Sequence, residues 1–159
     1  MKNKITAAVL YKHKRPLKIH NDLILTDVHK HQVLVKIKYS GLCGSQIAEI
    51  NGYREDKKYL PHFLGHEGCG EVVAVGSSVK KVKEKDKIIL SWIKGIGKDA
   101  GGKRLIYKNN KINYGSVTTF STYSLVSENR VFKAPKNISS KHAVLFGCAI
   151  PTGLGMLFN

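Results

Sequence analysis

Short runs of β-branched and aromatic residues, separated by turn-forming residues, are the main pattern along this chain. In residues 33–39, hydrophobic side chains alternate with a leucine and two lysines. Successive side chains of a strand point to opposite faces, so this alternation predicts a strand buried on one face only. The residues expected to face inward are Val33, Val35, Ile37 and Tyr39. The segments predicted as strands by composition are residues 5–11, 33–39, 71–75, 87–91 and 118–126.

Helical patterns are few. Residues 45–51 predict a short helix with Ser45 as N-cap and Gly52 as its stop. Residues 141–146 predict a second helix, capped by Ser139 or Ser140 and ended by a glycine. Many short strands with few helices predict a mainly β fold, an antiparallel and partly closed β-barrel.

The glycine- and lysine-rich residues 91–117 interrupt this pattern, and we expect an excursion loop there. No internal repeat and no low-complexity linker divides the chain. Residues 1–159 are therefore expected to form one domain. A hydrophobic content of 42% with 24% charged residues is typical of a soluble globular protein.

The charge is strongly positive, with 27 basic and 11 acidic residues giving +16. Such a field attracts nucleic acid, anionic lipid or anionic metabolites. The lysines are scattered, however, and the densest cluster, residues 80–87, contains two acids and no aromatic residue on which bases could stack. We expect a solvated turn there and no nucleic-acid partner.

The three cysteines, Cys43, Cys69 and Cys148, are an odd number without the dense spacing of a disulfide framework. This favours a reducing compartment. The first residues lack the apolar stretch and cleavage site of a signal peptide, and no segment reaches transmembrane length. We therefore expect a cytoplasmic protein without a membrane partner.

Residues 65–79, G-H-E-G-C-G-E-V-V-A-V-G-S-S-V, combine a possible metal-ligating histidine with a glycine-patterned strand. A catalytic zinc site needs three protein ligands and an open fourth position, and two cysteines with one histidine form one such set. Cys43 in G-L-C-G-S, His66 in G-H-E and Cys148 in G-C-A-I-P-T-G all lie at the ends of predicted elements. Cys69 is the competing ligand, but we expect it in the core, on a strand over residues 68–75.

Further motifs accompany these ligands. Residues 41–45 match G-x-C-G-[ST], and residues 147–153 match G-C-x-x-x-T-G. Thr119, Phe120 and Tyr123 lie in a segment that resembles a strand motif of the form T-x-F-x-x-Y. The fixed positions of the histidine motif are Gly65, His66, Glu67, Gly70, Gly76 and Val79. With these motifs, nearly the whole chain resembles the N-terminal, GroES-like catalytic domain of the zinc-dependent medium-chain alcohol dehydrogenases.

The resemblance implies that Cys43, His66 and Cys148 bind one catalytic zinc and that Glu67 is an alternative or transient ligand. It implies that Ser45 relays the alcohol proton and that Thr152 lies near the nicotinamide ring. The implied activity is that of an NAD(P)-dependent oxidoreductase acting on an alcohol, polyol or aldehyde, with a possible homo-oligomer. The chemistry of zinc is consistent with this activity, because a zinc ion lowers the pKa of a bound hydroxyl and polarises a bound carbonyl.

Some features depart from the family pattern. Gln46 stands where the family usually has an acid that holds the histidine ligand, and Ala48 replaces a relay histidine found in some members. Residues 91–117 contain none of the four cysteines of a structural zinc lobe, so we expect no second zinc.

A dinucleotide-binding unit needs G-x-G-x-x-G/A at a helix start, with an acid about 20 residues later. The one match, residues 95–100, is followed by Gly101 and Gly102, which would break that helix, and no acid lies between Asp99 and Glu128. We expect the Rossmann domain to be absent and the chain to be a truncated portion, inactive alone. The alternatives are a non-enzymatic GroES-like module that binds nucleic acid or an acidic partner, and a fragment that never assembles a stable site.

Overall fold

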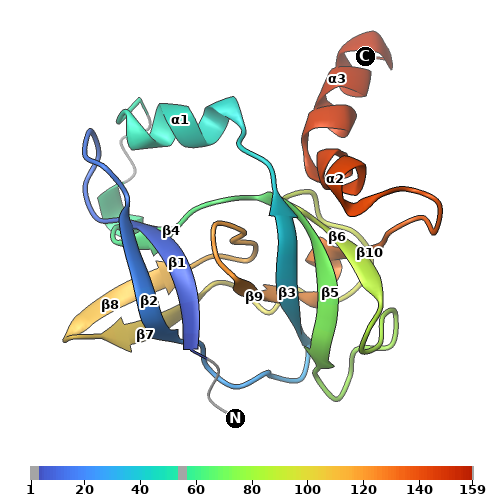
Figure 1. Ribbon diagram of the computed structural model, residues 1–159, viewed down its shortest axis with the longest axis horizontal. Helices are drawn as coiled ribbons and strands as arrows, with labels where there is room; N and C mark the ends of the chain where they lie inside the picture. Colours follow the sequence, from blue (N-terminus) through green and yellow to red (C-terminus); the bar gives the residue numbers. More distant parts are fainter. Residues whose placement is uncertain (1–3, 54–56, 159) are drawn as a thin grey trace.

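The computed structural model describes residues 4–53 and 57–158, whose strands form two curled five-stranded sheets (Figure 1). The first sheet has the order β2-β1-β4-β8-β7, and the second has the order β10-β6-β5-β3-β9. Neighbouring strands are antiparallel, except that β4 pairs with β8 in parallel. The first sheet comprises β1 (Lys4–Leu10), β2 (Lys18–Ile24), β4 (His62–Phe63), β7 (Lys103–Tyr107) and β8 (Asn110–Tyr114). The second comprises β3 (Gln32–Ser40), β5 (Glu67–Val75), β6 (Lys87–Ser91), β9 (Tyr123–Ser127) and β10 (Val131–Lys133).

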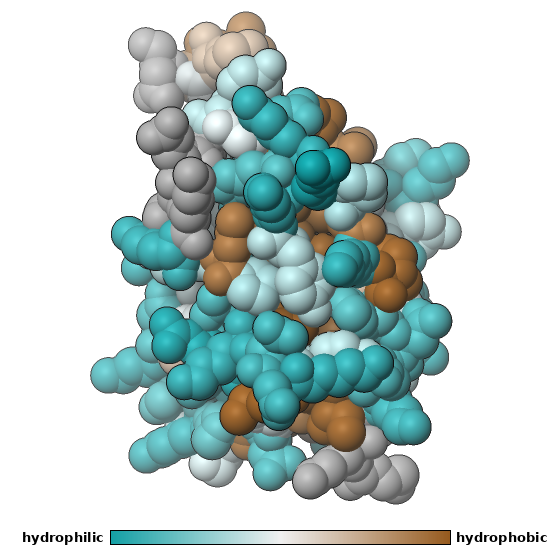
Figure 2. All heavy atoms as spheres, turned by 90° about the vertical axis from the view of Figure 1, so that its left-hand side faces the viewer, coloured by the Kyte–Doolittle hydropathy of each residue, from teal (hydrophilic) through white to brown (hydrophobic). Residues whose placement is uncertain are grey.

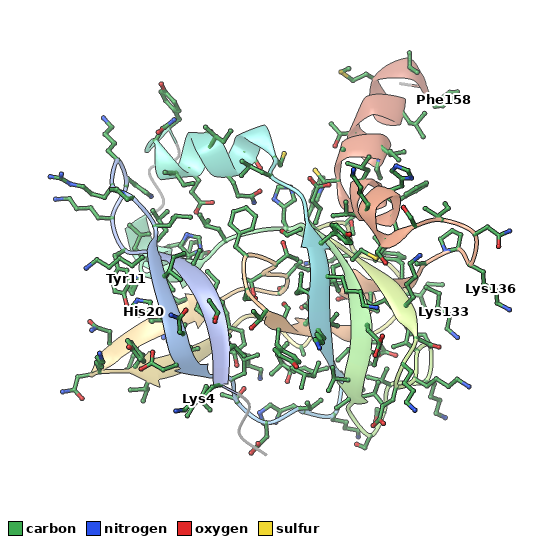
Figure 3. All side chains as sticks on the ribbon, in the orientation of Figure 1. Lys4, Tyr11, His20, Lys133, Lys136 and Phe158 are labelled. Atoms are coloured by element: carbon green, nitrogen blue, oxygen red, sulfur yellow. The ribbon has the colours of Figure 1, made fainter. Side chains whose placement is uncertain are left out.

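Three α-helices lie at one end of the sheets, on the same side in Figure 1. They are α1 (Gly44–Ile50), α2 (Ser140–Ala143) and α3 (Ala149–Phe158), accompanied by the 3₁₀ turns η1 (Lys57–Tyr59), η2 (Glu128–Arg130) and η3 (Val144–Gly147). Helix α3 buries none of its residues and extends away from the sheets to Phe158, which is labelled in Figure 3. No single helix among the described residues is long and apolar enough to cross a membrane, although Ser140–Gly147 and α3 together pass that test across a 52° bend.

The segment 118–122 joins the two sheets. Ala8 N of the first sheet donates to Phe120 O at 2.9 Å, and Ile37 N of the second donates to Thr122 O at 2.9 Å. Elsewhere, the two edge strands of the first sheet meet through side chains: Tyr107 donates its hydroxyl proton to Asp22 at 3.2 Å, and its ring lies 4.8 Å from that of His20. The prediction of a mainly β, partly closed barrel is confirmed.

Three apolar clusters hold the sheets and helices together. One is formed by the first sheet together with Leu125 of β9, and a second lies within the second sheet and the loop after β5. Strand β3 serves both, because Val33 and Val35 belong to the second cluster while Leu34 packs against the first. The third cluster unites Cys69 and Ile89 with α2 and η3. Each fully buried aliphatic side chain contributes about 1.5–3 kcal/mol, so this third cluster anchors the chain that leads into α3.

The predicted strands differ from the observed ones mainly in their bounds. Residues 5–11 and 87–91 match β1 and β6, whereas 71–75 is only the second half of β5. Of residues 118–126, only those from Tyr123 onward are in β9, because the preceding ones bond to both sheets at once. Tyr39, expected inward, is 47% exposed, because a register shift between Ile37 and Tyr39 breaks the alternation.

The expectation of an excursion loop over residues 91–117 is wrong for its second half, which forms the β7–β8 hairpin. Its turn residues Lys108 and Asn109 have φ of 45° and 65°. Two consecutive positive φ angles are typical of the tight turn that matches the twist of paired strands. Residues 95–100 form bends and no helix, in agreement with the rejection of a dinucleotide motif there.

The helix predictions hold, with changes at the caps. Cys43, and not Ser45, is the N-cap residue of α1, and Gly52 follows its end with φ of 76°. Ser139 caps α2, with its hydroxyl accepting from His142 N at 3.4 Å. The sequence did not predict α3.

Candidate metal centre

Three separate turns bring Cys43, His66 and Cys148 to one place. Cys43 follows β3 at the N-cap of α1, and His66 immediately precedes β5. Cys148 lies between η3 and α3, in a backbone conformation outside the helical and extended regions (φ −151°, ψ −56°). Their ligand atoms all lie within 4.8 Å of one another. The sequence-predicted set is therefore brought together from positions up to 105 residues apart.

The spacing fits a tetrahedral ion. Zn–S bonds of about 2.3 Å at tetrahedral angles place two thiolates roughly 3.8 Å apart. The Sγ atoms of Cys43 and Cys148 are 3.9 Å apart, and both cysteines are free thiols. A set of two sulfur atoms and one imidazole nitrogen suits zinc better than magnesium or calcium, which prefer oxygen ligands.

The two thiols differ in their electrostatic surroundings. Hydrogen bonds from the side chain and backbone of Ser45 lower the pKa of Cys43, with burial acting in the opposite direction. Burial raises the pKa of Cys148, and a hydrogen bond from Thr152 opposes this. Cys43 is therefore the thiol that ionises first.

Gln46 is buried on the inner side of α1, and its Nε2 lies 2.5 Å from His66 Nδ1. Its Oε1 is buried and has no hydrogen-bond partner in the part of the chain that the structure describes. Turning this amide by 180° places Oε1 at the imidazole, where it accepts the Nδ1 proton and leaves the Nε2 lone pair for a metal ion. In this orientation the buried Oε1 of Gln46 has a hydrogen-bond partner, and His66 is in the tautomer that can ligate a metal. The residues of the site therefore fit a zinc ion.

Glu67 contacts the turns of both cysteines. Its side chain is 3% exposed, and its Oε2 accepts the backbone N–H of Ala149, next to Cys148, at 3.3 Å. A Cβ on Gly41 would lie 2.3 Å from Glu67 Oε1, and one on Gly147 would lie 2.8 Å from Glu67 Cβ and 2.3 Å from Leu90 O. Glycine at these two positions therefore lets both cysteine turns close around the Glu67 side chain.

A cavity of about 370 Å³ opens at the three ligands. Ser45 and Thr152 also line it, and Thr152 Oγ1 lies 3.8 Å from Cys148 Sγ. The sequence analysis missed Trp92, whose half-exposed indole is a further wall of this cavity. Its position directly after β6, at the same sheet end as the cysteines, is the signal that could have identified it.

Cys69 does not belong to this group. It is fully buried on β5 in the cluster beneath α2, and burial raises the pKa of its thiol. The prediction that it is a core residue is confirmed.

Comparisons with known proteins agree with this geometry. A family model described as "Alcohol dehydrogenase GroES-like domain" matches residues 29–136. An S-(hydroxymethyl)glutathione dehydrogenase of Escherichia coli is 28% identical over 98% of this chain and 48% of its own length. The chain thus spans about half the length of the curated relatives it matches.

Solved structures show the same fold. An alcohol dehydrogenase zinc-binding domain protein from Burkholderia ambifaria superposes with a TM-score of 0.85 at 26% identity, over 100% of this chain and 49% of that one. The benzyl alcohol dehydrogenase of Acinetobacter calcoaceticus superposes with a TM-score of 0.77 at 26% identity, over 99% and 48%.

Gly147→Ala is expected to lower the free energy of unfolding by about 1–3 kcal/mol, because the added methyl group overlaps Leu90 O and the Glu67 backbone. Urea denaturation measures the change. Gly153→Ala is the matched control, since a Cβ there meets nothing within 4 Å and alanine favours the helix. Equal stability of the two variants would contradict the packing of Glu67 between the turns.

In the metal-free chain, alkylation should modify Cys43 at a lower pH than Cys148, because only the thiolate reacts and the two pKa values are shifted in opposite directions. Ser45→Ala should raise the pKa of Cys43 by removing a donor to its thiolate. Mass spectrometry of peptides alkylated across a pH series measures both. Preferential modification of Cys148 at low pH would refute this order.

Proposed function

Because the chain belongs to the family of alcohol dehydrogenase GroES-like domains, we propose that Cys43, His66 and Cys148 bind one Zn²⁺ and form the catalytic centre of a zinc-dependent oxidoreductase. The observation that carries the proposal is the convergence of the three ligand atoms within 4.8 Å of one another at the mouth of a cavity. The same convergence favours an enzyme centre over a module that binds nucleic acid or an acidic partner through its basic surface.

The substrate class is a small alcohol, polyol or aldehyde, and NAD(P) exchanges the hydride. Zinc bound here supplies a Lewis acid that polarises the substrate oxygen. We place residues 1–159 in one GroES-like domain, and the hydride transfer depends on a nucleotide-binding domain outside the described residues. Whole-enzyme activity, cofactor and any homo-oligomer are proposals, since the chain spans about half the length of its relatives.

The residues around the cavity have distinct roles in this proposal. Ser45 Oγ accepts the proton of the substrate hydroxyl while its own hydroxyl proton passes to water, because Ala48 stands in place of a relay histidine. Thr152 faces the nicotinamide side of the cavity, and Trp92 packs against the apolar part of the substrate. Glu67, proposed from the family as a transient ligand, must first release Ala149 N to reach the ion.

Two reduced thiols are required for this centre, so we propose that the protein works in the cytoplasm, where thiols stay reduced.

The chain purified under reducing, chelator-free conditions should contain about one equivalent of zinc, because tight sites fill during folding. Cys43→Ala and Cys148→Ala should each lose most of it, whereas Cys69→Ala, which removes a thiol outside the centre, should retain it. Elemental analysis measures the content. Less than about half an equivalent in the unsubstituted chain counts against the centre.

Gln46→Ala should weaken zinc binding about 10- to 100-fold, because a partner that orients a ligating histidine is removed. Gln46→Glu separates the two amide orientations. If the side chain accepts the His66 Nδ1 proton, the carboxylate does so more strongly and zinc affinity is kept or raised. If the side chain donates to His66, the carboxylate cannot, and affinity falls as in Gln46→Ala. Competition with a chromophoric chelator gives the affinities.

A further inference from the structure

A second cavity, of about 410 Å³, lies at the β7–β8 hairpin and shares no residue with the metal centre. The residues that matter for its chemistry are Arg104 on β7, Asn113 on β8, Tyr59 of η1 and Ser116. None of the described residues that line it carries a carboxylate. A cavity near Asp86, by contrast, is lined by lysines together with that acid. Among the described residues, the walls of the hairpin cavity therefore offer positive charge without a neutralising acid.

Arg104 is held in place on one side only. Its Nε donates to Asn113 Oδ1 at 2.8 Å. Asn113 is itself fixed, because its Nδ2 donates to Tyr59 O at 2.6 Å and its backbone N donates to Pro61 O at 2.9 Å. A guanidinium held in this way has lost much of its side-chain entropy before any ligand arrives, and this reduces the cost of binding.

The outer nitrogens of Arg104, Nη1 and Nη2, make no hydrogen bond or ion pair with any residue in the described ranges 4–53 and 57–158. The N–H groups of a guanidinium form strong hydrogen bonds with carboxylate and phosphate groups. Two parallel N–H groups match the spacing of two oxygens of one such anion. Lys111 lies on the same face of β8 as Asn113, because the two residues are two positions apart along the strand.

We propose that this cavity is a binding site for a small oxyanion, a phosphoryl or carboxylate group held by the Nη1 and Nη2 of Arg104. The hydroxyls of Tyr59 and Ser116 are the polar groups available to its remaining oxygens. The tip of the β7–β8 hairpin lies on the left-hand side of Figure 1, and the surface of the molecule seen from that side in Figure 2 is largely hydrophilic. The site is independent of the proposed zinc chemistry.

The test is a titration of the ¹⁵N-labelled chain with inorganic phosphate, and separately with succinate, at ionic strength held constant with sodium chloride. The Arg104 Nε–H signal and the backbone amides of the hairpin report binding. We expect saturable shifts confined to this cavity with at least one of the two anions. Saturation by phosphate alone identifies a phosphoryl site, and saturation by succinate alone identifies a carboxylate site.

Arg104→Gln should weaken the apparent affinity about tenfold or more, because two charge-assisted hydrogen bonds are lost. Lys136→Gln removes the same charge at the opposite end of the molecule (Figure 3) and should leave the affinity nearly unchanged. Asn113→Ala keeps the charge but frees the guanidinium, and should give an intermediate loss. Arg104 is exposed, so its substitution leaves the fold intact.

Two results would overturn the proposal. One is the absence of saturation with both anions, with shifts that rise linearly over many lysines. The other is an equal weakening by Arg104→Gln and Lys136→Gln, which would show that only the net charge of +16 attracts anions.

Discussion

The packing of two turns around the buried Glu67 side chain is the constraint on which the rest of the structure depends. Gly41 and Gly147 leave room for that side chain, and the backbone N–H of Ala149 bonds to its carboxylate. Each cysteine ligand is within two residues of one of these contacts. Because His66 directly precedes Glu67, this one residue connects the positions of all three ligands, and the centre assembles only when the second sheet and the turn after η3 have formed.

Much of the barrel was predictable from local pattern. The run of β1 buries one face against an apolar cluster and keeps its alternation in the sequence, whereas β6 is a short continuous apolar run because both of its faces are buried. The β7–β8 hairpin was not predicted, because its lysines and asparagines suggested a loop, although Leu105 and Ile112 form a buried cross-strand pair. Helix α3 was missed for a different reason: it is apolar nearly all round and contains a proline and two glycines, so its sequence has no alternation of apolar and polar faces that would indicate a helix.

The ligand set was predictable because thiols and an imidazole in such motifs carry a specific chemistry. What surrounds them depends on tertiary structure. Trp92 was missed because a tryptophan after a strand is not distinctive until the strand end is seen beside the cysteines. The asymmetry between the two thiols also arises from the fold, since Ser45 donates to one while burial dominates the other. The orphan oxygen of Gln46 likewise follows from its burial beside His66.

The most direct test of the central claim is X-ray absorption at the zinc edge of the metal-loaded chain. Coordination by Cys43, His66 and Cys148 predicts two sulfur neighbours at about 2.3 Å and one imidazole nitrogen at about 2.0 Å, with a lighter atom in the fourth position. A spectrum with only nitrogen and oxygen neighbours, or with a single sulfur, would contradict it.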